Sequence, residues 1–151
     1  MKIDDAVVAV RDFHMGTGAP VAEQPRLLPG DRHAAETLAG QLSSLKSGIA
    51  TADGDVLMQR AAMAIEELAE WLLAHASGDL VAAADAWADR AYVLLGDAVA
   101  AGLPAAELFA EVHASNMTKD LVADGTGKAR KGAAYRPPNL ADILKSAGTK
   151  L

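Results

Sequence analysis

The chain has 151 residues, of which 51% are hydrophobic and 4% aromatic, and its formal net charge is −6. A chain of this length can bury one hydrophobic core, so we expect a single domain over residues 1–151. The negative charge disfavours partners that require a basic surface, namely nucleic acids and anionic membranes. Because the chain contains no cysteine, disulfides, thiolate metal sites and a cysteine nucleophile are excluded. With no signal segment or membrane span expected, the sequence predicts a cytoplasmic protein.

Alanine, leucine and valine dominate the apolar residues, and the first two are strong helix formers. Apolar spacing and capping residues predict an all-α fold of about five helices, followed by a basic, partly irregular tail. The expected helices cover residues 3–15, 31–50 with Asp31 as its cap, 53 or 55 to about 76, 80–101, and 104–120 with Pro104 at its first position. A short helix near residues 140–145 is expected within the tail.

Three carboxylates on the third expected helix are the most informative feature of the sequence. At 100° per residue, Glu66, Glu67 and Glu70 fall within one arc of about 100°. We expect the helix to bury an apolar stripe on its other side, formed by Leu57, Ala61, Ile65, Leu68 and Leu72. A solvated charged face is the alternative. It would normally supply lysine or arginine three or four residues away, and these glutamates have none, which favours a bound cation.

The fourth expected helix offers two further carboxylates, since Asp85 and Asp89 lie one turn apart on one face. Together the two helices could present five carboxylates across one gap. All-oxygen ligands select hard cations, so Mg²⁺ or Mn²⁺ is predicted, and such ions support the cleavage of phosphoanhydrides. The alternative is that Asp85 is an ordinary surface residue and that Asp89 pairs with Arg90 or another neighbour.

Candidate anion-binding residues lie further along the chain. Asn116 and Lys119 are three residues apart near the end of the fifth expected helix, where a lysine also suits the helix dipole. Residues 124–128 (DGTGK) lack the first glycine and the final Ser or Thr of a phosphate-binding P-loop, so they are interpreted as a turn. The four histidines show no metal-ligand spacing.

The sequences EELAE at residues 66–70 and ADRAYV at 88–93 resemble the signature of the all-α NTP pyrophosphohydrolases, which include MazG-like proteins, dimeric dUTPases and phosphoribosyl-ATP pyrophosphohydrolases. The likeness is closest to the MazG-like branch with dUTPase-type activity. That preference rests on motifs spread along the chain: Phe13-His14, Gly18-Ala19-Pro20, Ala110 to His113 with Asn116 and Lys119, Lys131-Gly132, and Tyr135 to Asn139.

This resemblance implies a Mg²⁺-dependent (or Mn²⁺-dependent) homodimer, or dimer of dimers, that splits a nucleoside triphosphate such as dUTP into the monophosphate and pyrophosphate. It implies metal ligation by Glu66, Glu67, Glu70 and Asp89, with Asp85 as a further candidate ligand and with Glu67 or Glu66 orienting water. It also implies substrate binding by residues of the fifth helix and the tail, namely Asn116, Lys119, Lys128, Lys131, Tyr135 and Arg136.

One position departs from the family pattern of ExxE on one helix and ExxD on the next. Ala86 stands where the second pattern has its glutamate, and Asp85 is the nearest substitute. Two alternatives therefore remain open. The first is phosphoribosyl-ATP pyrophosphohydrolase activity, disfavoured here by the MazG-like motif at Asn116 to Lys119 and the tail at Tyr135 to Pro138. The second is a helical nucleotide binder that has lost turnover.

Overall fold

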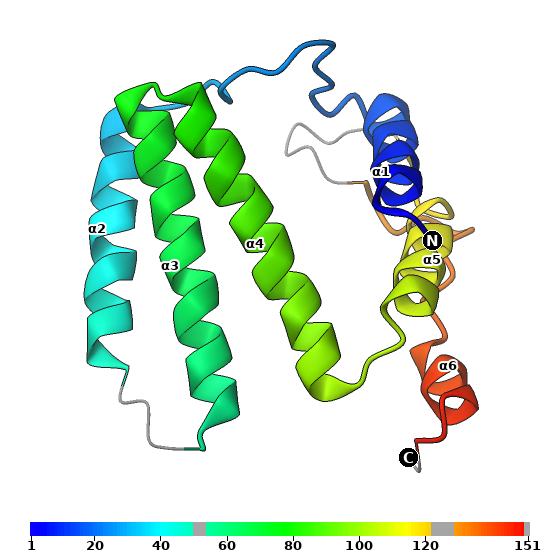
Figure 1. The fold of residues 1–151 in the computed structure, drawn as a ribbon. Coiled ribbons are helices and arrows are strands. Elements are labelled where there is room, and N and C mark those ends of the chain that lie inside the picture. Colours follow the sequence, from blue (N-terminus) through cyan, green and yellow to red (C-terminus); the bar gives the residue numbers. More distant parts are fainter. Residues whose placement is uncertain (50–53, 122–128, 150–151) are drawn as a thin grey trace. The chain divides into compact units, whose positions relative to one another are not determined.

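A computed structural model describes residues 1–49, 54–121 and 129–149, and its regular structure is entirely helical, as predicted. The described residues form six α-helices (Figure 1). Their bounds are α1 Ile3–Thr17, α2 Arg32–Gly48, α3 Val56–Ser77, α4 Leu80–Ala101, α5 Ala105–Asn116 and α6 Leu140–Ser146. The only β pairing among these residues is an isolated antiparallel bridge between Asp120 and Arg130.

The chain divides into two compact units, and each is described by itself. One unit comprises residues 24–101 and contains α2, α3 and α4, with α3 in contact with both of the others. Figure 1 shows these three helices side by side. The buried apolar residues of this unit are all alanines, namely Ala39, Ala69, Ala74, Ala83 and Ala86. Because alanine carries only a methyl group, these positions allow the helix backbones to approach closely.

Local capping explains where these helices begin and end. Asp31 caps α2 as predicted, its side chain accepting a hydrogen bond from the Ala34 amide at 3.1 Å. Asp55, one of the two predicted openers, caps α3 in the same way. Gly78 ends α3 with a φ of 81°, in the left-handed region that glycine adopts freely. Asp79 then accepts hydrogen bonds from two amides of the first turn of α4, so the chain reverses within two residues.

The second unit comprises residues 1–23 and 102–151, in which α5 contacts both α1 and α6. Thr17, at the end of α1, is 1% exposed, and its hydroxyl donates to the Phe13 carbonyl at 2.9 Å. The tail is tied to the end of α5: the Ser115 hydroxyl donates to the Arg136 carbonyl at 2.7 Å, and the Arg136 amide donates to the Thr118 hydroxyl at 2.9 Å. The predicted short helix of the tail is present as α6.

Two local predictions were wrong. Helix α5 ends at Asn116 rather than near residue 120, and Pro104 is its N-cap rather than its first residue. The helix stops early because Ser115 and Thr118 bind the tail backbone and because Asp120 forms the bridge with Arg130, which requires extended backbone.

The apolar stripe expected to be buried on α3 is not buried. Leu57 is 72% exposed, and the other four residues of the stripe are only partly covered. The buried residues of α3 are Ala69 and Ala74 instead.

The sequence was expected to form one domain over residues 1–151. Whether the two units pack together as one domain stays a prediction. Within the described part of the chain, no single helix is long and apolar enough to cross a membrane; α4 and α5 meet that criterion only when taken together.

Candidate active site

The five predicted metal ligands all lie in the unit of residues 24–101, on the neighbouring helices α3 and α4. Glu66, Glu67 and Glu70 come from the middle of α3, and Asp85 and Asp89 come from the first half of α4. The structure therefore brings the two halves of the predicted carboxylate cluster together, although it gives the three glutamates different surroundings.

Glu67 has the most unusual environment of the five. Its Oε2 atom is enclosed and finds no hydrogen-bond partner among the described residues. Burial raises the pKa of the Glu67 carboxyl above its ordinary value, and the negative charges of Glu70, Asp89, Glu66 and Asp85 raise it further, in that order. An enclosed carboxylate oxygen without a donor, surrounded by like charges, is the environment that a cation would relieve.

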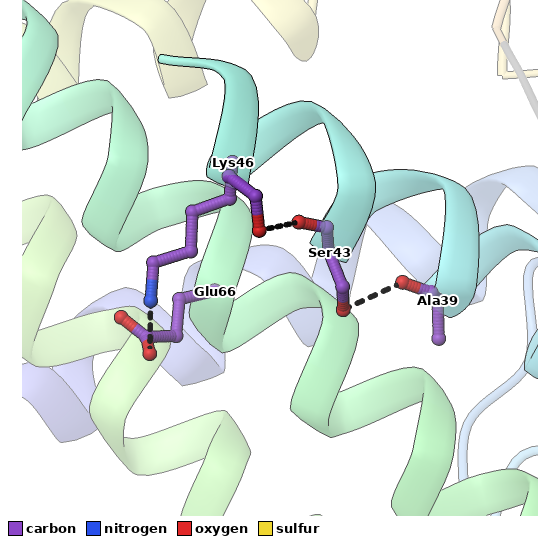
Figure 2. Close-up of polar contacts among 5 residues, drawn as sticks. Ala39, Ser43, Lys46 and Glu66 are labelled. Carbon is purple, nitrogen blue, oxygen red and sulfur yellow. Dashed lines mark hydrogen bonds and ion pairs between the residues drawn. The ribbon is translucent and has the colours of Figure 1, made fainter. Parts of the chain in front are cut away.

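Glu66 turns toward helix α2, where it forms an ion pair with Lys46 (Figure 2). In the same view, the hydroxyl of Ser43 donates back to the Ala39 carbonyl of its own helix at 3.0 Å, whereas the Lys46 side chain reaches across to α3. The side chains of Lys46 and Glu66 are 37% and 40% exposed. Exposed ion pairs contribute little stability, so this pair can exchange for other partners at small cost.

Glu70 and Asp85 line a cavity of about 490 Å³, which is bordered by helices α2, α3 and α4. Ala86 lines it as well, and Glu36 of α2 adds a carboxylate that sequence reasoning did not single out. A second cavity, of about 560 Å³, lies between residues 27–32 and the side chains of Trp71 and His75, and none of the five predicted carboxylates lines it. The first cavity is therefore the one associated with the cluster.

The alternative interpretation of Asp89 as a partner of Arg90 is not what the structure shows. The Arg90 guanidinium instead lies 4.7 Å from the centroid of the Trp71 ring, a cation–π contact between α4 and α3. Asp85 and Asp89 are both exposed, and neither forms an ion pair with another described residue.

The carboxylates are the type of ligand that a divalent cation such as Mg²⁺ or Mn²⁺ requires. Oxygen donors suit Mg²⁺ and Mn²⁺, and the unpartnered oxygen of Glu67 is positioned among them. In the conformation observed, no three His, Cys, Asp or Glu side chains of the described residues are close enough to share one ion. Ligation would therefore require rotation of side chains that are exposed and free to rotate, such as those of Glu70, Asp85 and Asp89.

The residues predicted to bind substrate lie in the other unit. Asn116 closes α5 and lines a small cavity of about 160 Å³ with Phe13 and His113, and Lys119 follows in the next turn. The ammonium of Lys131 lies 5.0 Å from the centroid of the Tyr135 ring.

The backbone of Arg136 is fixed by the hydrogen bonds to Ser115 and Thr118. The end of α5 and the tail segment bonded to it therefore contain five of the predicted substrate-binding residues, namely Asn116, Lys119, Lys131, Tyr135 and Arg136. Lys128 lies outside the described residues.

Three residues of the carboxylate unit were missed by sequence reasoning: Glu36, Lys46 and Arg60. Lys46 is 20 residues from its partner Glu66, and Arg60 is 37 residues from its partner Asp97. Neither pair has the spacing of three or four residues that marks a contact within one helix. Only the packing of α2 and α4 against α3 reveals them.

Comparison with known proteins bears on the same helices. The sequence profile of the phosphoribosyl-ATP pyrophosphohydrolase family matches residues 35–116, which is more than half of the chain and includes all five carboxylates. The chain belongs to this family. The family is part of the all-α NTP pyrophosphohydrolase superfamily, and its members hydrolyse a pyrophosphate bond. No curated protein and no solved structure gives a significant match.

Membership identifies the chain as an enzyme, a nucleotide pyrophosphohydrolase. The profile begins within α2 and ends at Asn116, the last residue of α5, so the tail lies outside it. The resemblance to this superfamily inferred from the glutamate and aspartate motifs is confirmed, whereas the MazG-like branch is not distinguished by the match.

Proposed function

We propose that this pyrophosphohydrolase is metal-dependent and cleaves the bond between the α- and β-phosphates of a nucleotide, with phosphoribosyl-ATP as its first candidate substrate. The observation that carries the proposal is the enclosed, unpartnered Oε2 of Glu67 among four other carboxylates, within the segment that matches the family. Water adds to the α-phosphorus, the bond from that phosphorus to the bridging oxygen breaks, and pyrophosphate leaves.

Glu67, Glu70 and Asp89 are the residues that would hold Mg²⁺ or Mn²⁺, and Asp85 is a fourth candidate. Such an ion neutralises phosphate charge and lowers the pKa of water. Glu67 also orients the attacking water, because its Oε2 has no hydrogen-bond partner among the described residues and can accept a hydrogen bond from that water. Glu66 contributes once it exchanges Lys46 for the metal or the water.

A second candidate substrate is dUTP or a related nucleoside triphosphate. It is supported by residues at the end of the family match and beyond it, where Asn116, Lys119 and the segment around Tyr135 and Arg136 resemble the MazG-like branch. Hydrogen bonds between the Arg136 backbone and the hydroxyls of Ser115 and Thr118 hold this segment at the end of α5. We propose that these residues and Lys131 supply the cations and amide groups that bind the phosphates.

Steady-state pyrophosphate release tests the proposal. Phosphoribosyl-ATP, dUTP, ATP and the other common nucleotides are compared with Mg²⁺, with Mn²⁺ and with a chelator. We expect kcat/KM to be highest for phosphoribosyl-ATP; a tenfold preference for dUTP would favour the second candidate. No release from any nucleotide in either metal would overturn the proposed activity.

The ligand assignment has its own test. Glu70→Gln should lower kcat by about a hundredfold or more, since it removes a charge that acts on the metal in the transition state. Glu107→Gln, the same change at an exposed residue of α5, is the matched control and should leave kcat unchanged. Equal rates in the two variants would remove Glu70 from the site.

Because Ala86 stands where the family pattern has a glutamate, the metal site either uses Asp85 as a replacement ligand or has one ligand fewer. Ala86 is 4% exposed, so a glutamate there would bring an unpaired charge into a buried position, whereas Asp85 is exposed beside Glu70 in the cavity. We therefore propose that Asp85 takes the place of the missing ligand. Asp85→Asn should weaken Mn²⁺ binding about as much as Asp89→Asn; normal affinity in Asp85→Asn would mean that the site works with fewer ligands.

We further propose a homodimer, as the family resemblance implies. Helix α4 carries four large side chains that are at least half exposed and spaced so that they share one side of the helix, namely Val81, Tyr92, Leu95 and Val99. A second copy of the chain would cover this apolar side. Sedimentation equilibrium should give twice the monomer mass for the wild type and the monomer mass for Tyr92→Asp with Val99→Asp; a monomeric wild type would refute the dimer.

A further inference from the structure

The proposed site creates a problem for the packing of α3 against α4. Glu67 and Glu70 on α3 face Asp85 and Asp89 on α4 with the same sign of charge, and this repulsion contributes to the raised pKa of Glu67. Without metal, attractions elsewhere along the two helices oppose the repulsion. Besides the cation–π contact between Arg90 and Trp71, the described residues supply an ion pair between these helices, and it is made by Arg60.

Arg60 reaches from the start of α3 to two acceptors on α4. Its Nε donates to Oδ1 of Asp97 at 2.6 Å, and its Nη2 donates to the backbone carbonyl of Val93. The Arg60 side chain is 23% exposed and Lys46 is 37% exposed, so the cation of this ion pair is better shielded from water, while the two carboxylates, Asp97 and Glu66, are about equally exposed. An arginine can hold both acceptors at once because its planar guanidinium presents several donors in a fixed geometry.

Gly96 makes room for this guanidinium. A Cβ atom at position 96 would lie 3.0 Å from Cζ and Nη1 of Arg60, closer than side-chain atoms normally approach. The guanidinium therefore lies against the backbone of α4 at a residue without a side chain. A glycine inside a helix is unfavourable by about 1 kcal/mol relative to alanine. That cost at Gly96 is offset by the contact that the glycine allows.

The positions of these residues connect the contact to the carboxylates. Arg60 precedes Glu67 by seven residues, which is two turns on the same side of α3. Asp97 follows Asp89 by eight residues, which is about two turns along α4. The chain reverses between α3 and α4, so Arg60 lies opposite Asp97 and Glu67 lies opposite Asp89. The two pairs are separated by roughly 10–12 Å along the helix axes.

We propose that Arg60 is a positioning residue for the metal site: by holding Asp97 and the Val93 carbonyl, it fixes the register in which Glu67 and Glu70 face Asp89. This inference rests on the proposed metal-dependent activity. Its consequence is that the metal-free protein already holds its ligands at the right level, so that binding needs side-chain rotation and no sliding of one helix along the other.

Whether the loss of Arg60 weakens or tightens the binding of a divalent cation distinguishes a positioning role from a purely electrostatic effect. Arg60 is a cation about a Debye length from the cluster, so its removal should slightly tighten the binding of a divalent cation if charge alone mattered. If Arg60 fixes the register, its removal should weaken binding. Partners that orient metal ligands typically change affinity 10- to 100-fold, and we expect roughly tenfold weaker Mn²⁺ binding in Arg60→Met.

The experiment measures the Mn²⁺ dissociation constant of the full chain by electron paramagnetic resonance, without nucleotide. Arg60→Lys should give an intermediate loss, because a lysine cannot hold both acceptors in the same geometry. Asp97→Asn should weaken binding, and the double variant should be no weaker than Arg60→Met alone, since both changes break one contact.

Two control variants isolate the effect. Arg11→Met removes the same charge from an exposed position of α1, and Ala84→Gly destabilises α4 at an exposed position without touching the contact. Both should bind Mn²⁺ like the wild type.

Unchanged or tighter Mn²⁺ binding in Arg60→Met would overturn the positioning role, and Arg60→Lys decides in the same way if Arg60→Met does not fold. Weaker binding in Ala84→Gly to the same extent would also overturn it, because general destabilisation would then explain the loss. A wild type that binds no Mn²⁺ and releases no pyrophosphate would instead refute the proposed function, which keeps the two failures distinguishable.

Discussion

Replacing Glu67 by glutamine should stabilise the metal-free protein at neutral pH. The pKa of Glu67 is raised by burial and by four neighbouring carboxylates, so the folded state holds the proton more tightly than the unfolded state does. The stability linked to that proton is present below the pKa of the unfolded chain and is lost as pH rises through the folded pKa. Glutamine resembles the protonated form at every pH, so Glu67→Gln should keep that stability at pH 7.

The size of the effect follows first from burial and then from the charges around Glu67. Glu70 lies one turn along α3, and a like-charged pair at that spacing costs about 0.2–0.5 kcal/mol. Burial and the carboxylates of Asp85 and Asp89 on α4 add to this cost, so Glu67→Gln should raise the free energy of unfolding by about 1 kcal/mol. For a chain of this size, 1 kcal/mol corresponds to a rise in Tm of roughly 2–4 °C. Near pH 3 the wild-type carboxyl is protonated as well, so the difference should vanish.

Thermal melts followed by circular dichroism test this in the presence of a chelator at pH 7 and near pH 3, with Glu107→Gln as the control for an exposed glutamate. Millimolar Mn²⁺ should reverse the order at pH 7, because the wild type gains binding energy that the variant lacks. A variant that melts at or below the wild-type temperature at pH 7 without metal would refute the reasoning, as would a difference that persists unchanged near pH 3.

Two further predictions concern the tail. Ser115→Ala removes the hydrogen bond to the Arg136 carbonyl at 2.7 Å and should cost about 1 kcal/mol, with faster amide exchange at Arg136 as the measurement; exchange at the wild-type rate would show that the bond does not hold the tail. Gly132→Ala places a Cβ where the Asp120 carboxylate lies, and because Asp120 is exposed and only the end of its side chain has to move, we expect a loss of about 0.5 kcal/mol or less in thermal unfolding. A much larger loss would mean that the Asp120 carboxylate is held in place.

The helices could be predicted closely because their signals are local. Asp31 caps α2, and the bounds of α4 were predicted to the residue, since the caps and apolar spacing act within a few positions of the chain. The end of α5 was missed because its cause is distant in sequence: Ser115 and Thr118 bond to Arg136, which is 21 and 18 residues away. No pattern within a helical window carries that information.

The candidate site shows the same contrast: spacing along one helix could be predicted, whereas the partners that neighbouring helices bring could not. Helical spacing correctly placed Glu66, Glu67 and Glu70 on one arc of α3, but three residues on one arc need not share one environment. Helix α2 brings Lys46 to Glu66, and α4 brings Asp89 toward Glu67. Since the neighbouring helices decide which carboxylate is paired and which is left without a partner, the roles within the cluster follow from the packing of three helices. The packing depends in turn on Arg60, which the carboxylate pattern does not contain.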